Sequence, residues 1–179
     1  NSTRQSDAAV EPTAHELPQE ALDRLEEDHA KQCRHCSSAS GYTNLVFGEG
    51  SATARLMFVG EAPGTMEDQV GRPLVGTAGQ KLDEMLTAMG LTRQEVYIAN
   101  VLKARPPDNR TPLQTEAEAC GVWLTRQIEV VQPEVLIALG GSAAKLLLGI
   151  EMGANHPRGT WGELKVGELA IAVMPTFHP

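Results

Sequence analysis

The sequence predicts an α/β fold in which helices cover both faces of a mainly parallel sheet. Two observations support this prediction. Three continuous apolar runs, typical of buried strands, occur at residues 54–60, 95–101 and 134–140. Each is followed by a segment with helical periodicity or a helix-capping pattern. Because strands that alternate with helices build parallel sheets, the loops after these strands should meet at the edge where such folds bind ligands.

The remaining elements follow in chain order. Residues 1–17 are polar, acidic and without periodicity, so we expect a disordered tail before one domain at 18–179. Residues 18–32 place Ala21, Leu22 and Leu25 on one side of a helix. Further expected elements are a helix at 77–90 that stops at Gly90, a helix that has Thr111 as its N-cap and ends before Pro133, a helix at 141–149 with Ser142 as its N-cap, and a hairpin-like pair of strands at 161–179.

Composition limits the class of protein. The 179 residues are 41% hydrophobic and 21% charged, which is typical of a globular domain. No apolar run approaches the ~20 residues that span a bilayer. Three cysteines, an odd number, argue against a disulfide framework, so we expect a cytoplasmic protein. The chain begins at Asn1 rather than methionine and stops after a strand-like run, so we expect both ends to be trimmed.

The net charge of −8 disfavours nucleic acid as a partner, but the charge is unevenly distributed. Residues 1–32 hold eight acids and three bases and so contribute −5 of it. The loop "KARPPDNR" places Lys103, Arg105 and Arg110 within eight residues. Such a basic loop either contacts DNA phosphates or is a solvated surface loop. The helix start at Ser142 could hold one further phosphate through backbone N–H groups.

Cys33 and Cys36 form a C-x-x-C pair, and Cys120 is the third cysteine. A redox pair is disfavoured, because the motif follows a helix and not a strand. Three interpretations stay open. The cysteines could bind zinc together with His29 or His35, they could contribute to an iron–sulfur cluster, which normally needs four thiolates, or they could be unliganded thiols.

The loop "VGEAPGTMED" follows the first predicted strand. Its glycines, Gly60 and Gly64, let the backbone approach a ligand closely. The loop fits neither G-x-G-x-x-G nor a Walker A motif, so a dinucleotide or nucleoside triphosphate is not indicated.

Several motifs in the same order resemble the iron–sulfur, family 4 uracil-DNA glycosylases. They are "FGEGSATARLMFVGEAPGTMEDQVGRPLVGTAGQKLDEML", "VYIANVLKARPPDNRTP" and "FHP", within a similarity that extends from Cys33 to Pro179. The resemblance implies a three-layer α/β/α sandwich with a four-stranded, mainly parallel sheet. It implies a monomeric DNA-repair hydrolase that removes uracil from single- or double-stranded DNA in base excision repair, after the base is flipped into a pocket.

The resemblance also implies roles for individual residues. Asn100 matches the asparagine that reads uracil, His178 matches the histidine that stabilises the leaving base, and Glu61 matches an acid that positions water or stabilises the cationic sugar. Ala62, Pro63 and Gly64 complete the substrate-binding motif. Leu74 stands where the family places a phenylalanine against uracil, so we expect weaker stacking, which is worth ~1–3 kcal/mol per base.

The family's cluster is held by four cysteines, and this chain departs from that set. Cys33, Cys36 and Cys120 match three of them, but the fourth position is Ala104. The expected outcomes are a [3Fe–4S] core, a labile [4Fe–4S] cluster or no cluster. Two alternative functions follow from the departures: a glycosylase with altered base preference, prompted by Leu74, or a DNA- or uracil-binding relative with impaired catalysis. Because the family's DNA-wedging loop would follow His178, we expect slow excision by this 179-residue chain.

Overall fold

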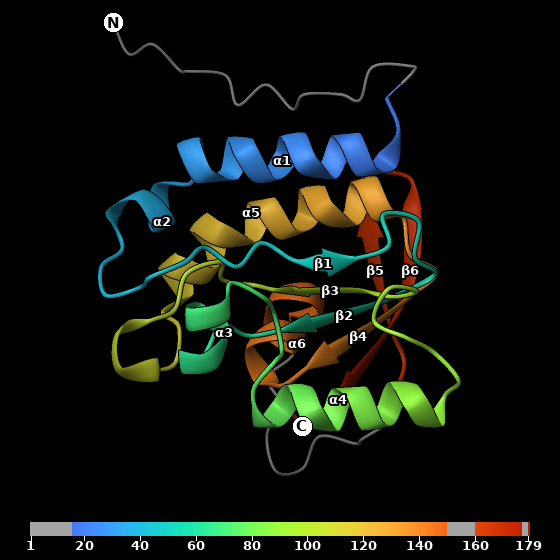
Figure 1. The fold of residues 1–179 in the computed structure, drawn as a ribbon. Coiled ribbons are helices and arrows are strands. Elements are labelled where there is room, and N and C mark those ends of the chain that lie inside the picture. The colour runs from blue at the N-terminus through green and yellow to red at the C-terminus, as the bar shows by residue number, and fades with distance from the viewer. Residues whose placement is uncertain (1–15, 150–159, 177–178) are drawn as a thin grey trace, which may run out of the picture.

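The computed structural model describes residues 16–149, 160–176 and 179, which form helices packed on both faces of a six-stranded sheet (Figure 1). The sheet order is β1-β3-β2-β4-β6-β5. Its strands are β1 (Glu49–Gly50), β2 (Leu56–Gly60), β3 (Tyr97–Asn100), β4 (Val135–Leu139), β5 (Gly162–Val166) and β6 (Leu169–Thr176). The helices are α1 (Pro18–Gln32), α2 (Arg34–Ser38), α3 (Thr65–Val70), α4 (Thr77–Ala88), the 3₁₀ turn η1 (Pro107–Asn109), α5 (Gln114–Val131) and α6 (Gly141–Leu148).

The central strands β3, β2, β4 and β6 are parallel, as the alternation of strands and helices predicted. Two antiparallel edge strands, β1 and β5, enlarge the expected four-stranded sheet. β5 is the first strand of the predicted hairpin. β1 has only two residues and no alternating pattern, so the sequence carries no signal for it. It exists because Glu49 and Gly50 pair with Ile98 and Tyr97 of β3.

Alternate residues of the buried strands face opposite helical layers. On one face, Met57 and Val59 of β2 pack in a cluster with Leu124 and Ile128 of α5. On the other face, Phe58 packs with Leu82 and Leu86 of α4. α1 lies on the outer side of α5, and α4 lies on the opposite side of the sheet (Figure 1). Both faces are therefore covered, which explains why these strands read as continuous apolar runs.

Two predicted helix caps are wrong. The N-cap of α5 is Leu113 and not Thr111, because the Glu116 carboxylate accepts a hydrogen bond from the Leu113 N–H at 2.9 Å and so fixes the first turn there. The N-cap of α6 is Gly140 and not Ser142. Ser142 lies two residues after this cap, and its hydroxyl contacts Glu61, which follows β2.

The predicted disordered tail falls mostly on residues 1–15, outside the described part of the chain. Glu16 is described, and its carboxylate accepts two hydrogen bonds from Arg24, at 3.0 and 2.7 Å. Within residues 16–149 and 160–176, no helix combines the length and apolar character needed to cross a membrane.

Candidate functional site

The carboxyl ends of β2, β3 and β4 meet at one edge of the sheet. The connection from β2 to β3 passes through α4 on one face, and the connection from β3 to β4 passes through α5 on the other. The strand order therefore reverses between β2 and β4, the position at which open α/β sheets bind ligands. Glu61 follows β2 here and Ser142 follows β4. The Ser142 hydroxyl donates a hydrogen bond to Glu61 Oε2 at 2.9 Å.

Glu61 faces an open cavity of about 610 Å³, which is large enough for a base and its sugar. The other lining residues come from the segment leading into α5, from α5 itself and from α6, and they include Thr111, Pro112, Gln114, Gly141 and Ser142. A second cavity, of about 240 Å³, adjoins Glu61 on its other side. It is lined by Ala62, Pro63 and Gly64 on one wall and by Pro106, Asn109 and Arg110 on the other.

Asn100 ends β3 directly beside Gly60 of β2, with which it pairs in the sheet. Its side chain is 2% exposed. Among the described residues, its carboxamide has no hydrogen-bond partner. A Cβ on residue 60 would come within 2.5 Å of Asn100 Oδ1, so the carboxamide occupies the space that only glycine leaves free. Buried amides without partners are rare, and one at the binding edge of a sheet indicates a group held ready for a ligand.

The backbone carbonyl of Asn100 is fixed by a buried network. Lys103 Nζ donates hydrogen bonds to Asn100 O at 2.7 Å and to Gln127 Oε1 at 2.6 Å. Gln127 Nε2 in turn donates to Phe47 O and to the Tyr97 hydroxyl, both at 2.9 Å. Burial of the ammonium lowers the pKa of Lys103 to about 8. The prediction that Lys103 contacts DNA is therefore wrong, because its side chain is 0% exposed and already bonded inside the protein.

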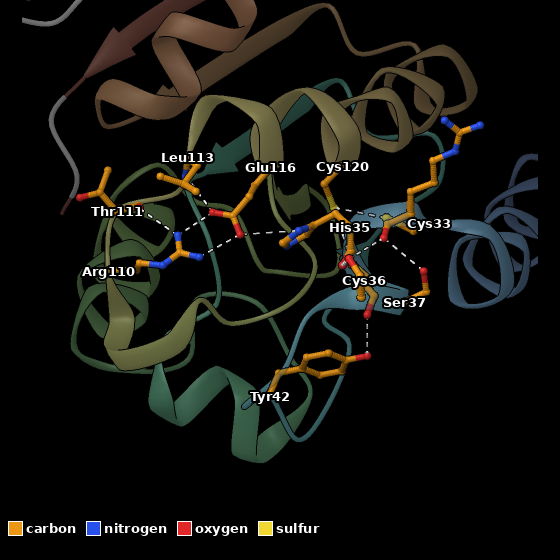
Figure 2. A network of polar contacts seen from close by, with 12 residues as sticks. Cys33, His35, Cys36, Ser37, Tyr42, Arg110, Thr111, Leu113, Glu116 and Cys120 are labelled. Atoms are coloured by element: carbon orange, nitrogen blue, oxygen red, sulfur yellow. Dashed lines mark hydrogen bonds and ion pairs between the residues drawn. The ribbon is translucent and has the colours of Figure 1, made fainter.

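Of the other predicted DNA-contact residues, Arg110 lines the smaller cavity, Ser142 lines the larger one, and Arg105 directly precedes Pro106 in the wall of the smaller cavity. Arg105 Nε donates to Asn109 Oδ1 at 2.6 Å, and Asn109 Nδ2 donates to Thr65 Oγ1 at 3.1 Å, which ties the basic loop to α3. Arg110 is paired with the Glu116 carboxylate, as Figure 2 shows. This pairing lowers the pKa of Glu116 to about 2, chiefly through the hydrogen bonds from Arg110.

Leu74 lies in the apolar cluster of α4 and the sheet, where it packs with Phe58 and Leu139 and is 3% exposed. Its φ of 48° is unusual for leucine. Arg93 holds this backbone by donating from Nη1 to Leu74 O at 2.9 Å and from Nη2 to Pro73 O at 2.6 Å. Neither cavity that Glu61 lines is bordered by Leu74 or Asn100. The predicted single cavity joining these residues with His178 stays a prediction, because His178 lies outside the described residues.

Two positioning residues carried no recognisable signal. Asp68 is 2% exposed, and its carboxylate accepts hydrogen bonds from Thr43 N at 2.8 Å and Asn44 N at 3.0 Å. It thereby joins α3 to the segment after the C-x-x-C motif. Arg93 fixes the "GRPL" loop as described above. Both roles depend on partners roughly twenty residues or more away along the chain, which local patterns do not reveal.

The three cysteines form a second, separate centre on the α1, α2 and α5 side of the molecule (Figure 2). Cys33 and Cys36 sulfurs each lie 3.9 Å from the sulfur of Cys120, and Cys36 Sγ lies 3.4 Å from His29 Nε2. All four residues are buried, and their ligand atoms lie within 4.8 Å of one another. The chain therefore has a His/Cys group that could hold a metal ion. His35 points elsewhere, with Nδ1 3.6 Å from Glu116 Oε2.

The chemistry of this centre fits a cation. Contact with Cys120 and then with Cys33 raises the pKa of the Cys36 thiol, because a second thiolate beside the first would be repelled. A bound cation reverses that effect. Ala104 belongs to the same cluster and is 1% exposed, so its methyl group occupies the side on which the family's fourth cysteine would stand. The residues present supply three thiolates and not the four that hold an iron–sulfur cluster.

The chain is similar in sequence to known proteins over most of its length. Residues 47–179 match the family described as the uracil DNA glycosylase superfamily. The chain is 43% identical to a type-4 uracil-DNA glycosylase of Thermotoga maritima over 89% of this chain and 82% of that protein. It is 47% identical to one of Archaeoglobus fulgidus, over 82% and 76% of the two chains. It is 41% identical to one of Sulfurisphaera tokodaii, over 89% and 74%.

Proposed function

This chain belongs to the uracil DNA glycosylase superfamily, and from that membership and its sheet-edge site we infer that it hydrolyses the N-glycosidic bond of uracil in DNA. It is a DNA-repair hydrolase of base excision. The structural observation that carries the proposal is the buried carboxamide of Asn100, which has no hydrogen-bond partner among the described residues.

The carboxamide suits uracil because its donor and acceptor complement the base. Uracil presents acceptor, donor and acceptor groups along its pairing edge, so one N–H donor and one oxygen acceptor can engage two neighbouring groups at once. The base has to leave the DNA stack to reach this group, at a cost of roughly a few kcal/mol. Because Lys103 already fixes the backbone carbonyl of Asn100, this residue loses little conformational entropy when uracil binds.

In the hydrolysis, the bond between sugar C1′ and uracil N1 breaks as a water oxygen bonds to C1′. The electron pair leaves with uracil and spreads over N1 and O2. The Glu61 carboxylate, which accepts a hydrogen bond from the Ser142 hydroxyl, is the group proposed to accept a proton from water or to stabilise the cationic sugar. His178 is the proposed donor to the negative charge on O2.

The DNA strand is proposed to follow the rim formed by Arg105, Arg110 and Ser142. The loop between β3 and α5 carries both arginines, and it faces the "GEAPG" loop across the smaller cavity. Their internal partners hold the guanidinium groups in place, and Arg110 keeps 39% of its side chain exposed. Single- and double-stranded DNA, a monomeric state and a cytoplasmic location stay predictions.

The resemblance to the family 4 enzymes implies that the cysteine group described above would hold an iron–sulfur cluster. Three thiolates and Ala104 do not supply its usual ligands. No step of the proposed hydrolysis uses it.

The proposal is tested by Asn100→Ala on a single-stranded oligonucleotide that contains one uracil, with strand cleavage by alkali read on a gel. We expect excision to fall about 100-fold or more, because the base loses its positioning contacts. The free energy of unfolding should change by less than about 1 kcal/mol, because an amide without partners contributes no hydrogen bond to the fold.

The control is Gln127→Ala, which removes a buried amide that does have partners. It should lower the free energy of unfolding by roughly 1–3 kcal/mol for each polar group left unsatisfied. Unchanged uracil excision by folded Asn100→Ala would contradict the proposal. Oligonucleotides with other damaged bases test the alternative prompted by Leu74, since a faster reaction with one of them would indicate altered base preference.

A further inference from the structure

His29 completes the group of three cysteines in the position where a fourth thiolate is missing. We propose that His29, Cys33, Cys36 and Cys120 bind a single tetrahedral zinc ion in this chain. The four residues lie on α1, on α2 and the junction before it, and on α5. Cysteine sulfur and histidine nitrogen are the ligands that zinc prefers in structural sites.

The spacing of the donor atoms is that of a mononuclear site. Ligands at a zinc–sulfur distance of ~2.3 Å and tetrahedral angles lie about 3.8 Å apart. The separations are 3.9 Å for each of the two sulfur pairs with Cys120 and 3.4 Å between Cys36 Sγ and His29 Nε2, and all four donor atoms lie within 4.8 Å of one another. Thiolates on the separate irons of a cubane lie roughly 6 Å apart, because four irons and four sulfides stand between them. The observed group is too compact to enclose such a cluster.

The structure also selects His29 over the nearby His35. His29 lies in the last turn of α1, four residues before Cys33, so that both side chains project from the same side of the helix end. Its ring is 1% exposed and packs between Phe47 and Trp123, with both ring centroids at 5.4 Å. These contacts hold Nε2 toward Cys36. His35 Nδ1 lies instead 3.6 Å from the Glu116 carboxylate.

A closed site with four protein ligands is structural rather than catalytic. It would join the α1–α2 corner to α5, and Phe47 and Ala104 pack in the same cluster. Ala104 directly follows Lys103, whose ammonium fixes the carbonyl of Asn100. The zinc ion would therefore stabilise the segment of Lys103 and Ala104, which fixes the carbonyl of Asn100, without itself contacting DNA or the base.

The test is metal analysis of the full 179-residue chain, produced in medium that contains both iron and zinc and purified without oxygen. We expect about one zinc ion per chain and no acid-labile sulfide. After the metal is removed, Co²⁺ should bind at one equivalent with the intense visible bands of a tetrahedral thiolate site, and Zn²⁺ should displace it.

Three variants identify the histidine. His29→Ala should weaken Co²⁺ binding by more than about 100-fold, because even indirect partners of metal ligands contribute 10–100-fold to affinity. His35→Ala is the matched control and should leave the affinity and the spectrum unchanged. His29→Cys should keep one Co²⁺ per chain with stronger sulfur-to-cobalt bands. This variant keeps the test decisive if His29→Ala fails to fold.

Two results would overturn the proposal. One is iron with a matching amount of acid-labile sulfide in the purified wild-type chain. The other is equal Co²⁺ affinity in His29→Ala and His35→Ala. Neither readout depends on glycosylase activity, so failure of the zinc site and failure of the proposed reaction are distinguishable.

Discussion

Gly60→Ala tests whether the position of the Asn100 carboxamide controls excision. The added Cβ would lie 2.5 Å from Asn100 Oδ1, whereas an ordinary contact is about 3.5 Å. The carboxamide therefore has to move by roughly 1 Å. A displacement of ~1 Å in a positioning group can cost ~100-fold in rate, which corresponds to about 2.7 kcal/mol of transition-state stabilisation. We expect kcat/KM for uracil excision to fall by that factor.

The fold should tolerate the change, because Gly60 has no positive φ and ends a strand in which alanine is permitted. The assay is single-turnover cleavage of a single-stranded uracil oligonucleotide, with thermal unfolding measured alongside. Gly76→Ala is the matched control, since its Cβ would make only ordinary contacts, with the Glu67 carboxylate oxygens at 3.5 Å and with Met66 Cβ at 3.7 Å. Wild-type kcat/KM in folded Gly60→Ala would refute the reasoning that the crowded carboxamide reads the base.

Four further predictions concern the remaining features. Leu74→Ala should lower the free energy of unfolding by roughly 2–5 kcal/mol in urea, because it leaves a cavity in the core, while exposed Met85→Ala on α4 should change it by under about 0.5 kcal/mol. Ser142→Ala should lower the excision rate more than it weakens DNA binding, since it removes the hydrogen bond from Ser142 that orients Glu61; an unchanged excision rate would argue against that role. Arg110→Ala should make the chain slightly less stable above pH 4.5, because an exposed ion pair contributes little to stability. In the wild type, hydrogen bonds from Arg110 lower the pKa of Glu116 to about 2. The stabilisation from this ion pair is therefore complete above the ordinary pKa of a glutamate and is lost as the pH falls toward 2. The stabilities of the wild type and of Arg110→Ala, plotted against pH, should converge in acid. Ala104→Cys adds a fourth thiolate to the cluster of Cys33, Cys36 and Cys120, so iron and acid-labile sulfide should replace zinc in the purified variant; no gain in iron would show that the group accepts only a single metal ion.

The sequence by itself determined the main elements and the place of the site. The apolar runs that became β2, β3 and β4 are buried on both faces, so their composition follows directly from the layers that cover them. Their order with the intervening helices was enough to predict a parallel sheet and to place Glu61 and Asn100 at its carboxyl edge. The order of the motifs identified the family, because several motifs in one sequence are far more specific than any of them alone.

Only the tertiary structure decided which polar side chains face inward. In a basic loop, Lys103, Arg105 and Arg110 look alike, yet Lys103 is fully buried because Gln127, 24 residues along the chain, supplies its acceptor. Likewise, His29 and His35 both lie close to Cys33 and Cys36 in the sequence. Contacts with Phe47 and Trp123 hold His29 at the cysteine sulfurs, whereas His35 lies against Glu116. Cys120 reaches Cys36 across 84 residues. Burial and long-range contact are properties of the packed chain, and no local pattern of residues encodes them.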